Sequence, residues 1–198
     1  MDFVKEWLET AKEVLTQPSS FFENEDRRDG FGYPIKFAAV SFLIAGIIGA
    51  IEVIATGSGI GIGTAIGAVI GGLIGIVIWS AIVHLFVALL GGSGYGNTLA
   101  AYAYGTALAP ISSALGLISL VPSLGTLGVG TIASAAVWLY GIYIYIQGLK
   151  AFQGLSTGRA ALAVLLPTAI IVGLVVALVV LVAGAALAAL GGGALAGV

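Results

Sequence analysis

The hydrophobic pattern divides the chain into a polar N-terminal region and a long apolar remainder that begins at Phe37. Beyond that point glycine, serine and proline interrupt the apolar runs, and only Glu52, Lys150 and Arg159 are charged at neutral pH. The length fits runs of about 20 residues, as a helix needs to cross the hydrocarbon core of a bilayer. Because the runs do not alternate apolar with polar residues as barrel strands do, helices are the expected spanning elements.

The predicted fold is therefore an all-α integral membrane bundle of five transmembrane helices, preceded by a cytoplasmic amphipathic helix. The five spans are expected at Phe37–Ala55, Ile62–Leu90, Leu99–Val121, Leu127–Leu149 and Ala160 to about Ala183. Pro110 falls about half-way along the third span and predicts a kink there. Residues 1–36 are assigned to the cytoplasmic helix and a polar linker, and residues 37–198 to the transmembrane domain.

The positive residues predict an orientation. All seven lysines and arginines lie before the first expected span or in the connection Lys150–Arg159, whereas Thr56–Gly61 and Pro122–Thr126 contain none. An odd number of crossings puts all the positive residues on one face. The bias of lysine and arginine toward the cytoplasm then places the N-terminus inside, the C-terminus outside and the protein in the cell membrane.

The polar N-terminal region contains one amphipathic helix, which Pro18 is expected to end. Its apolar residues recur every three or four positions, with charged residues opposite, so they form one stripe. The helix is expected in the headgroup layer or against the cytoplasmic end of the bundle, and its slightly negative charge argues against selective capture of anionic lipid. The segment Phe22–Tyr33 is predicted to be a polar linker. The expected interfacial residues are Phe3, Trp7, Leu8, Ala11 and Leu15.

Five glycines recur at four-residue spacing in the second expected span: Gly59, Gly63, Gly67, Gly71 and Gly75. We call them the glycine ladder. Helices in a bilayer associate through close backbone packing, which small residues at this spacing permit. The ladder therefore predicts a helix-packing face, and its partner is either another helix of the same chain or a second copy, as in a homo-oligomer.

A few polar side chains fall within the expected spans. Glu52 and His84 are ionisable, and such residues inside a membrane are functional candidates. They lie at different expected depths, so direct pairing is not predicted. Tyr140, Tyr143 and Gln147 share one face of the fourth span and predict a polar seam toward other helices, which serves packing or lines a path for a solute.

Composition excludes several functions. The chain has no cysteine and one histidine, so thiolate chemistry, disulfides and the usual zinc sites are not expected. No cluster of acidic, basic or histidine residues predicts catalysis, so the protein is expected to be no enzyme and to need no cofactor or metal. A net charge of −2 and few lysines argue against nucleic acid as a partner.

Three segments resemble the Yip family, also called Ypt/Rab-interacting proteins, and the prokaryotic branch is the closer comparison. They are VLTQPSSFF (Val14–Phe22), HLFVALLGGSGYGNTLAAYAYGTALAP (His84–Pro110) and GLKAFQGLSTGRAALAVLLPTAII (Gly148–Ile171). The resemblance implies five spans after a polar N-terminal region and no known catalysis. The long acidic arm and the aspartate-leucine-tyrosine-glycine-proline motif of the eukaryotic branch are absent, which argues against binding of small GTPases.

Two functions remain after these exclusions. One is a scaffold or partner-binding protein in membrane organisation, with the lipid bilayer and other membrane proteins or further copies as partners. The other is a small channel or transporter subunit, in which Glu52, Tyr140 and Tyr143 line a path for an ion or small solute. A hydrated cavity that reaches Tyr140 and Glu52 would favour transport, and a dry interior would favour the scaffold.

Overall fold

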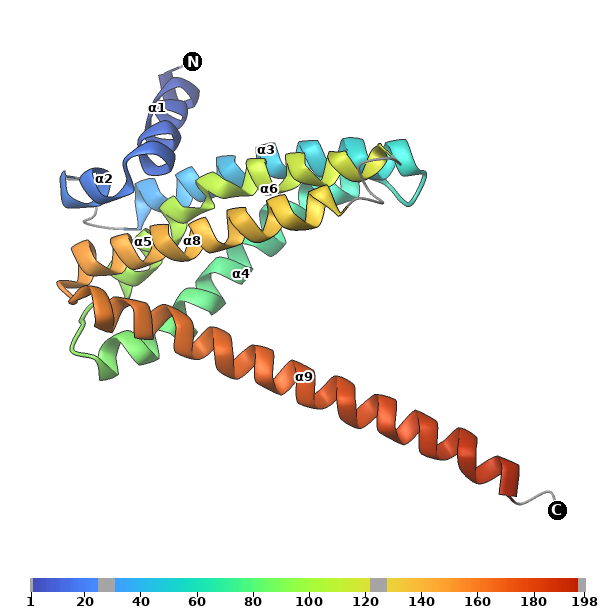
Figure 1. Ribbon diagram of the computed structural model, residues 1–198. Coiled ribbons are helices and arrows are strands. Elements are labelled where there is room, and N and C mark those ends of the chain that lie inside the picture. Colours follow the sequence, from blue (N-terminus) through green and yellow to red (C-terminus); the bar gives the residue numbers. More distant parts are fainter. Residues whose placement is uncertain (1, 25–30, 122–127, 196–198) are drawn as a thin grey trace. The chain divides into compact units, whose positions relative to one another are not determined.

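The computed structural model describes residues 2–24, 31–121 and 128–195, and these residues contain helices and no strand (Figure 1). The chain divides into two compact units, Met1–Val164 and Leu165–Val198. The elements are α1 (Asp2–Thr16), α2 (Pro18–Asn24), α3 (Gly32–Thr56), α4 (Gly61–Leu89), α5 (Tyr95–Gly105), η2 (Thr106–Leu108), α6 (Ala109–Gly116), η3 (Leu117–Leu120), α8 (Val129–Gln153) and α9 (Thr157–Leu195). The prediction of an all-helical chain is confirmed.

Among the described residues, four helices are long and apolar enough to cross a membrane: α3, α4, α8 and the Thr157–Gly184 part of α9. The third expected span, Leu99–Val121, is not one long helix. It is a series of shorter segments, α5 to η3, with a 3₁₀ turn at Thr106–Leu108. Pro110 lies in the first turn of α6, where its missing N–H leaves no helical bond unmade. The connection Pro122–Thr126 lies outside the described residues.

The hairpin of α3 and α4 is built on close backbone contact. Gly57 ends α3 in the left-handed conformation, with φ of 65°. A Cβ added at Gly46 would lie 2.8 Å from the Cβ of Ala68, and one added at Gly72 would lie 2.6 Å from the ring of Phe42. These two glycines therefore set how closely the helices approach.

Helix α5 contacts α3, α4 and α8 within the first unit. Every residue from Thr98 to Leu108 is buried. Small side chains in this segment allow the surrounding helices to pack closely. Tyr102 stacks on Tyr145 of α8 with ring centroids 4.2 Å apart. The Thr98–Leu108 part of the broken third segment is thus the core around which the longer helices pack.

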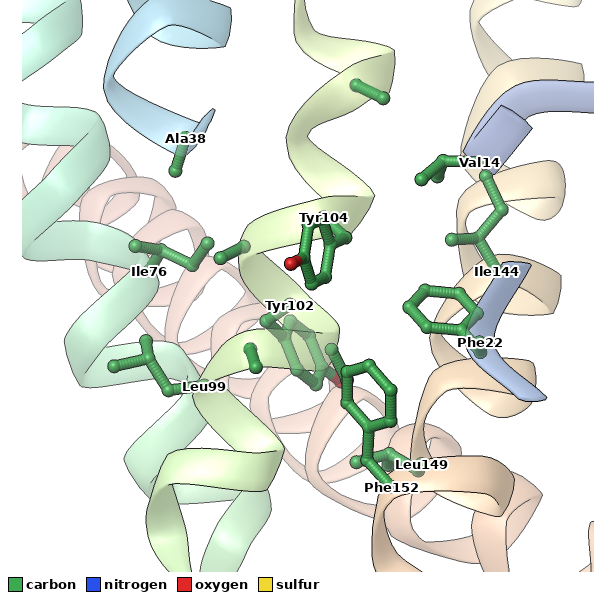
Figure 2. Packing of buried hydrophobic residues seen from close by; sticks show 14 of the residues in the cluster. Val14, Phe22, Ala38, Ile76, Leu99, Tyr102, Tyr104, Ile144, Leu149 and Phe152 are labelled. Carbon is green, nitrogen blue, oxygen red and sulfur yellow. The ribbon is translucent and has the colours of Figure 1, made fainter. Parts of the chain in front are cut away.

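Aromatic side chains of α2 complete this core (Figure 2). Phe22 is fully buried, and its ring meets that of Phe152 edge-on at 5.3 Å. Phe21 meets the ring of Tyr104 at 5.0 Å. The prediction that Phe22–Tyr33 is a polar linker was therefore wrong at its first residue, because Phe22 belongs to the core. Residues 25–30 lie outside the described part of the chain.

The second unit consists of the α9 residues from Leu165 onward. This part contains Pro167 within the helix and no charged residue. Its aliphatic composition and length are those of a membrane-spanning helix.

Candidate functional site

The glycine ladder lies on an open face of α4. All five glycines are exposed, and, apart from adjacent residues and nearby backbone of α4 itself, no described atom of the first unit lies within 4 Å of a Cβ built at Gly63, Gly67, Gly71 or Gly75. Gly59 stands in the turn before α4, beside Val53. The part of the first unit that the structure describes therefore provides no partner helix for the ladder.

Isoleucine side chains border the ladder. Ile66, Ile70 and Ile74 are each more than half exposed, and Ile74 lies seven residues, close to two helical turns, from Gly67. A groove of glycines beside branched aliphatic side chains gives another helix both close backbone approach and apolar contact. This combination makes the face a candidate packing surface.

The glycines that pack α3 on α4 are different ones, and sequence analysis missed them. A Cβ built at Gly46 would lie 2.9 and 3.0 Å from the carbonyl oxygen and Cα of Ala65, and one built at Gly72 would meet the ring of Phe42. A signal was present, since Ala65, Ala68 and Gly72 recur at three- and four-residue spacing. The longer and more regular ladder concealed it.

The predicted polar seam on α8 is occupied by the N-terminal helices. The Tyr140 hydroxyl donates a hydrogen bond to the Leu15 carbonyl oxygen at 2.7 Å. Gln147 accepts one at its Oε1 from the Ser19 hydroxyl at 2.9 Å. Tyr143 is 42% exposed, with its ring 5.8 Å from that of Tyr140. The hydrogen bond of Tyr140 thus connects α1 to α8, and that of Gln147 connects α2 to α8.

Glu52 and His84 lie apart from this seam and from each other. Glu52 is half-buried near the end of α3, and a Cβ built at Gly116 would come 2.6 Å from its Oε2. His84 Nδ1 lies 2.9 Å from the Thr98 hydroxyl oxygen on α5. A groove of about 490 Å³ between α1 and α2 has Glu9, Lys12 and Glu13 among its lining residues and includes neither Glu52 and His84 nor the three seam residues. Glu52 and His84 thus make these contacts in different places from those of Tyr140 and Gln147.

A hydrogen-bond network around Gln153 ties the turn after α4 to α5 and α8. Gln153 Oε1 accepts from the Ser93 N–H at 2.8 Å, and its Nε2 donates to the Thr98 hydroxyl at 2.9 Å and to the Gly94 carbonyl at 3.1 Å. Thr98 thereby connects Gln153 to His84. His84 is thus hydrogen-bonded to a residue of this network, and sequence analysis did not identify Gln153 or Thr98 because their partners are distant in the chain.

Helix α1 packs across the beginning of α3. The Trp7 indole N–H donates to the Ser41 hydroxyl at 3.0 Å, and the Trp7 ring stacks on Phe37 with centroids 5.9 Å apart. The Thr10 and Tyr33 hydroxyls lie 2.9 Å apart. Of the five expected interfacial residues, Trp7 and Ala11 are buried, Phe3 and Leu15 are half-buried, and Leu8 is exposed.

Among the described residues, no group of three or more histidine, cysteine, aspartate or glutamate side chains is placed to hold a metal ion. A protein-family model, the Yip1 domain, matches residues 12–181. This range runs from α1 into α9 and covers most of the chain. No curated protein and no solved structure matches.

Proposed function

The chain belongs to the Yip1 domain family, and from this premise we propose that it is a non-enzymatic, multi-pass membrane scaffold that binds other membrane proteins or further copies of itself. The open glycine ladder on α4 is the observation that carries the proposal. It offers a lateral surface at which a neighbouring helix approaches the backbone closely. The interior of the first unit, filled by aromatic and small side chains, supports a packing role over a transport role.

The proposed topology has five crossings, with the broken segment Tyr95–Leu120 as the third. At about 1.5 Å per residue its helical pieces reach over 30 Å, enough for the hydrocarbon core. Its interruptions at Thr106–Leu108 are compatible with a membrane because this part is surrounded by other helices. The N-terminus is proposed to be cytoplasmic and the C-terminus outside, because lysine and arginine gather on one face.

The alternative, a channel or transporter subunit, draws support from the interrupted helix at the centre of the bundle, a feature that transporters use at binding sites. The positions of Glu52, His84 and Tyr140 do not favour it. Each makes its contacts in a different place, with Gly116, Thr98 and Leu15 respectively. The scaffold is therefore the better supported function.

Replacing Gly67 and Gly71 with leucine tests the scaffold. The double variant is expected to insert and fold, because both positions are open within the first unit, and to lose assembly, because leucine fills the groove. The measurement is the size distribution in a mild detergent. A matched control is Ala135→Leu/Ala136→Leu, which adds bulk at exposed positions of α8. An unchanged size distribution in the glycine variant would refute the proposal.

A further inference from the structure

Helix α1 crosses α3 instead of running parallel to it. The contacts between the two helices show which side of α1 faces each end of α3. Phe3 and Thr10, seven residues apart, both meet Tyr33 near the start of α3, with 6.2 Å between the rings of Phe3 and Tyr33. Trp7, between them, reaches Phe37 and Ser41 further along α3. One side of α1 therefore faces the polar end of α3, and the opposite side faces its apolar part.

Angular positions around α1 assign residues to these two sides. At about 100° per residue, Thr10 lies about 60° to one side of Trp7, whereas Val4 and Leu8 lie about 60° and 100° to the other side. Val4 and Leu8 therefore point along α3 toward its apolar part. They are 63% and 61% exposed, so the bundle leaves this strip uncovered.

The acidic and basic residues of α1 also lie on different sides of the helix, as measured by their angle from Trp7. Glu6 and Glu13 lie about 100° and 120° from Trp7 on the Thr10 side, toward the polar end of α3. Lys12 and Lys5 lie about 140° and 160° from Trp7 on the other side, next to the Val4–Leu8 strip. Lys5 also makes a 3.9 Å pair with Glu9, and because both side chains are largely exposed this pair places little constraint on the lysine.

The depth of α1 matches the boundary between headgroups and acyl chains. Lys36 is the last charged residue of α3 before its apolar part, and Leu43 is the first large apolar side chain after it to be exposed, at 46%. Ser41, which accepts the hydrogen bond from Trp7, lies five residues beyond Lys36, or about 7 Å along the axis of α3. An interfacial helix buries its apolar face to about 5–10 Å in this boundary.

We infer that α1 lies in the bilayer interface with Val4 and Leu8 inserted among the acyl chains, Lys5 and Lys12 reaching lipid phosphates, and its acidic face turned to water. The occupant of the exposed strip is phospholipid. The inference rests on the proposed membrane-spanning bundle, and it revises the expected lipid contacts: Trp7 and Ala11 bind the bundle, and Val4 and Leu8 bind lipid. The helix would then fix the depth of the scaffold in its leaflet.

The chain has no cysteine, so single-cysteine variants can each carry one environment-sensitive fluorophore. Leu8→Cys and Val4→Cys test the strip, Glu13→Cys is the matched control on the opposite face, and Leu43→Cys reports whether α3 is in the bilayer. Each labelled full-length protein is reconstituted in phosphatidylcholine vesicles and quenched by brominated lipid or by aqueous iodide. Probes at positions 4 and 8 are expected to be blue-shifted and quenched several-fold more by brominated lipid than by iodide, and the probe at position 13 should show the reverse.

Three results would overturn the inference. Equal iodide quenching at positions 8 and 13, with position 43 quenched by lipid, would show that α1 stands clear of the bilayer while the bundle spans it. Shielding of positions 4 and 8 from both quenchers would show that protein covers the strip. Iodide quenching at position 43 would overturn the proposed membrane-spanning bundle as well.

Discussion

Two glycines that look alike in the sequence are expected to respond in opposite ways to a single added methyl group. A Cβ at Gly46 would lie 2.8 Å from the Cβ of Ala68 and 2.9 Å from the Ala65 carbonyl oxygen. Neither atom belongs to a flexible side-chain end, so α3 and α4 must move apart. A Cβ at Gly67 would meet no described atom within 4 Å other than adjacent residues and nearby backbone of its own helix.

The comparison of Gly46→Ala with Gly67→Ala isolates this contact. Overpacking of a tight interface costs about 1–3 kcal/mol. Alanine favours a helix over glycine by about 1 kcal/mol, and this gain applies to both variants, so it cancels in the difference. We therefore expect Gly46→Ala to have a free energy of unfolding about 1–3 kcal/mol below that of Gly67→Ala.

The assay is reversible unfolding of the monomer in mixed micelles, followed by far-ultraviolet circular dichroism as the fraction of denaturing detergent rises. Both variants are measured at a protein concentration at which size-exclusion chromatography shows monomers, so that assembly through the ladder does not contribute. Equal stability of the two variants, or a less stable Gly67→Ala, would refute the assignment of packing and open faces on these helices.

Three further substitutions test the N-terminal helices and the turn network. Ser41→Ala leaves the buried Trp7 N–H without its acceptor and is expected to lower the free energy of unfolding by about 1–3 kcal/mol. The same detergent titration measures this loss, and an unchanged midpoint would contradict the role of that bond. Phe22→Ala removes a fully buried ring and should cost about 3–5 kcal/mol and release α2 to proteolysis; a protected α2 would argue against the core position of Phe22. Gln153→Ala removes the acceptor of the Ser93 N–H, so hydrogen exchange at the Ser93 amide should accelerate while exchange in α3 stays unchanged. Equal protection of the Ser93 amide in the variant and the unaltered protein would count against the network.

The long apolar helices could be predicted from sequence because length and lack of charge decide whether a segment can cross a membrane. Pro110 likewise marked an interruption that the structure has. The extent of the interruption was not predictable, because the 3₁₀ turn at Thr106–Leu108 lies inside a buried segment whose neighbours come from distant parts of the chain. Periodicity does not report such contacts.

The candidate site was predictable only in part. The spacing of the glycine ladder was visible, but spacing alone does not say whether a face is covered, and the close contacts fall on Gly46 and Gly72. Phe22 looked like the beginning of a linker because polar residues follow it. Its burial depends on Phe152, which lies far away in sequence. Local pattern thus located the elements, and tertiary contacts decided their roles.

Photo-crosslinking in native membranes tests the glycine ladder as a packing face most directly. A photoreactive amino acid replaces Ile74, which is 55% exposed on the ladder face, and a control replaces Leu139, which is 60% exposed on α8. The account predicts a crosslinked adduct at position 74 that Gly67→Leu/Gly71→Leu abolishes, and mass spectrometry of the adduct identifies a second copy or another membrane protein. Crosslinking only to lipid at position 74, indistinguishable from that at position 139, would contradict the account.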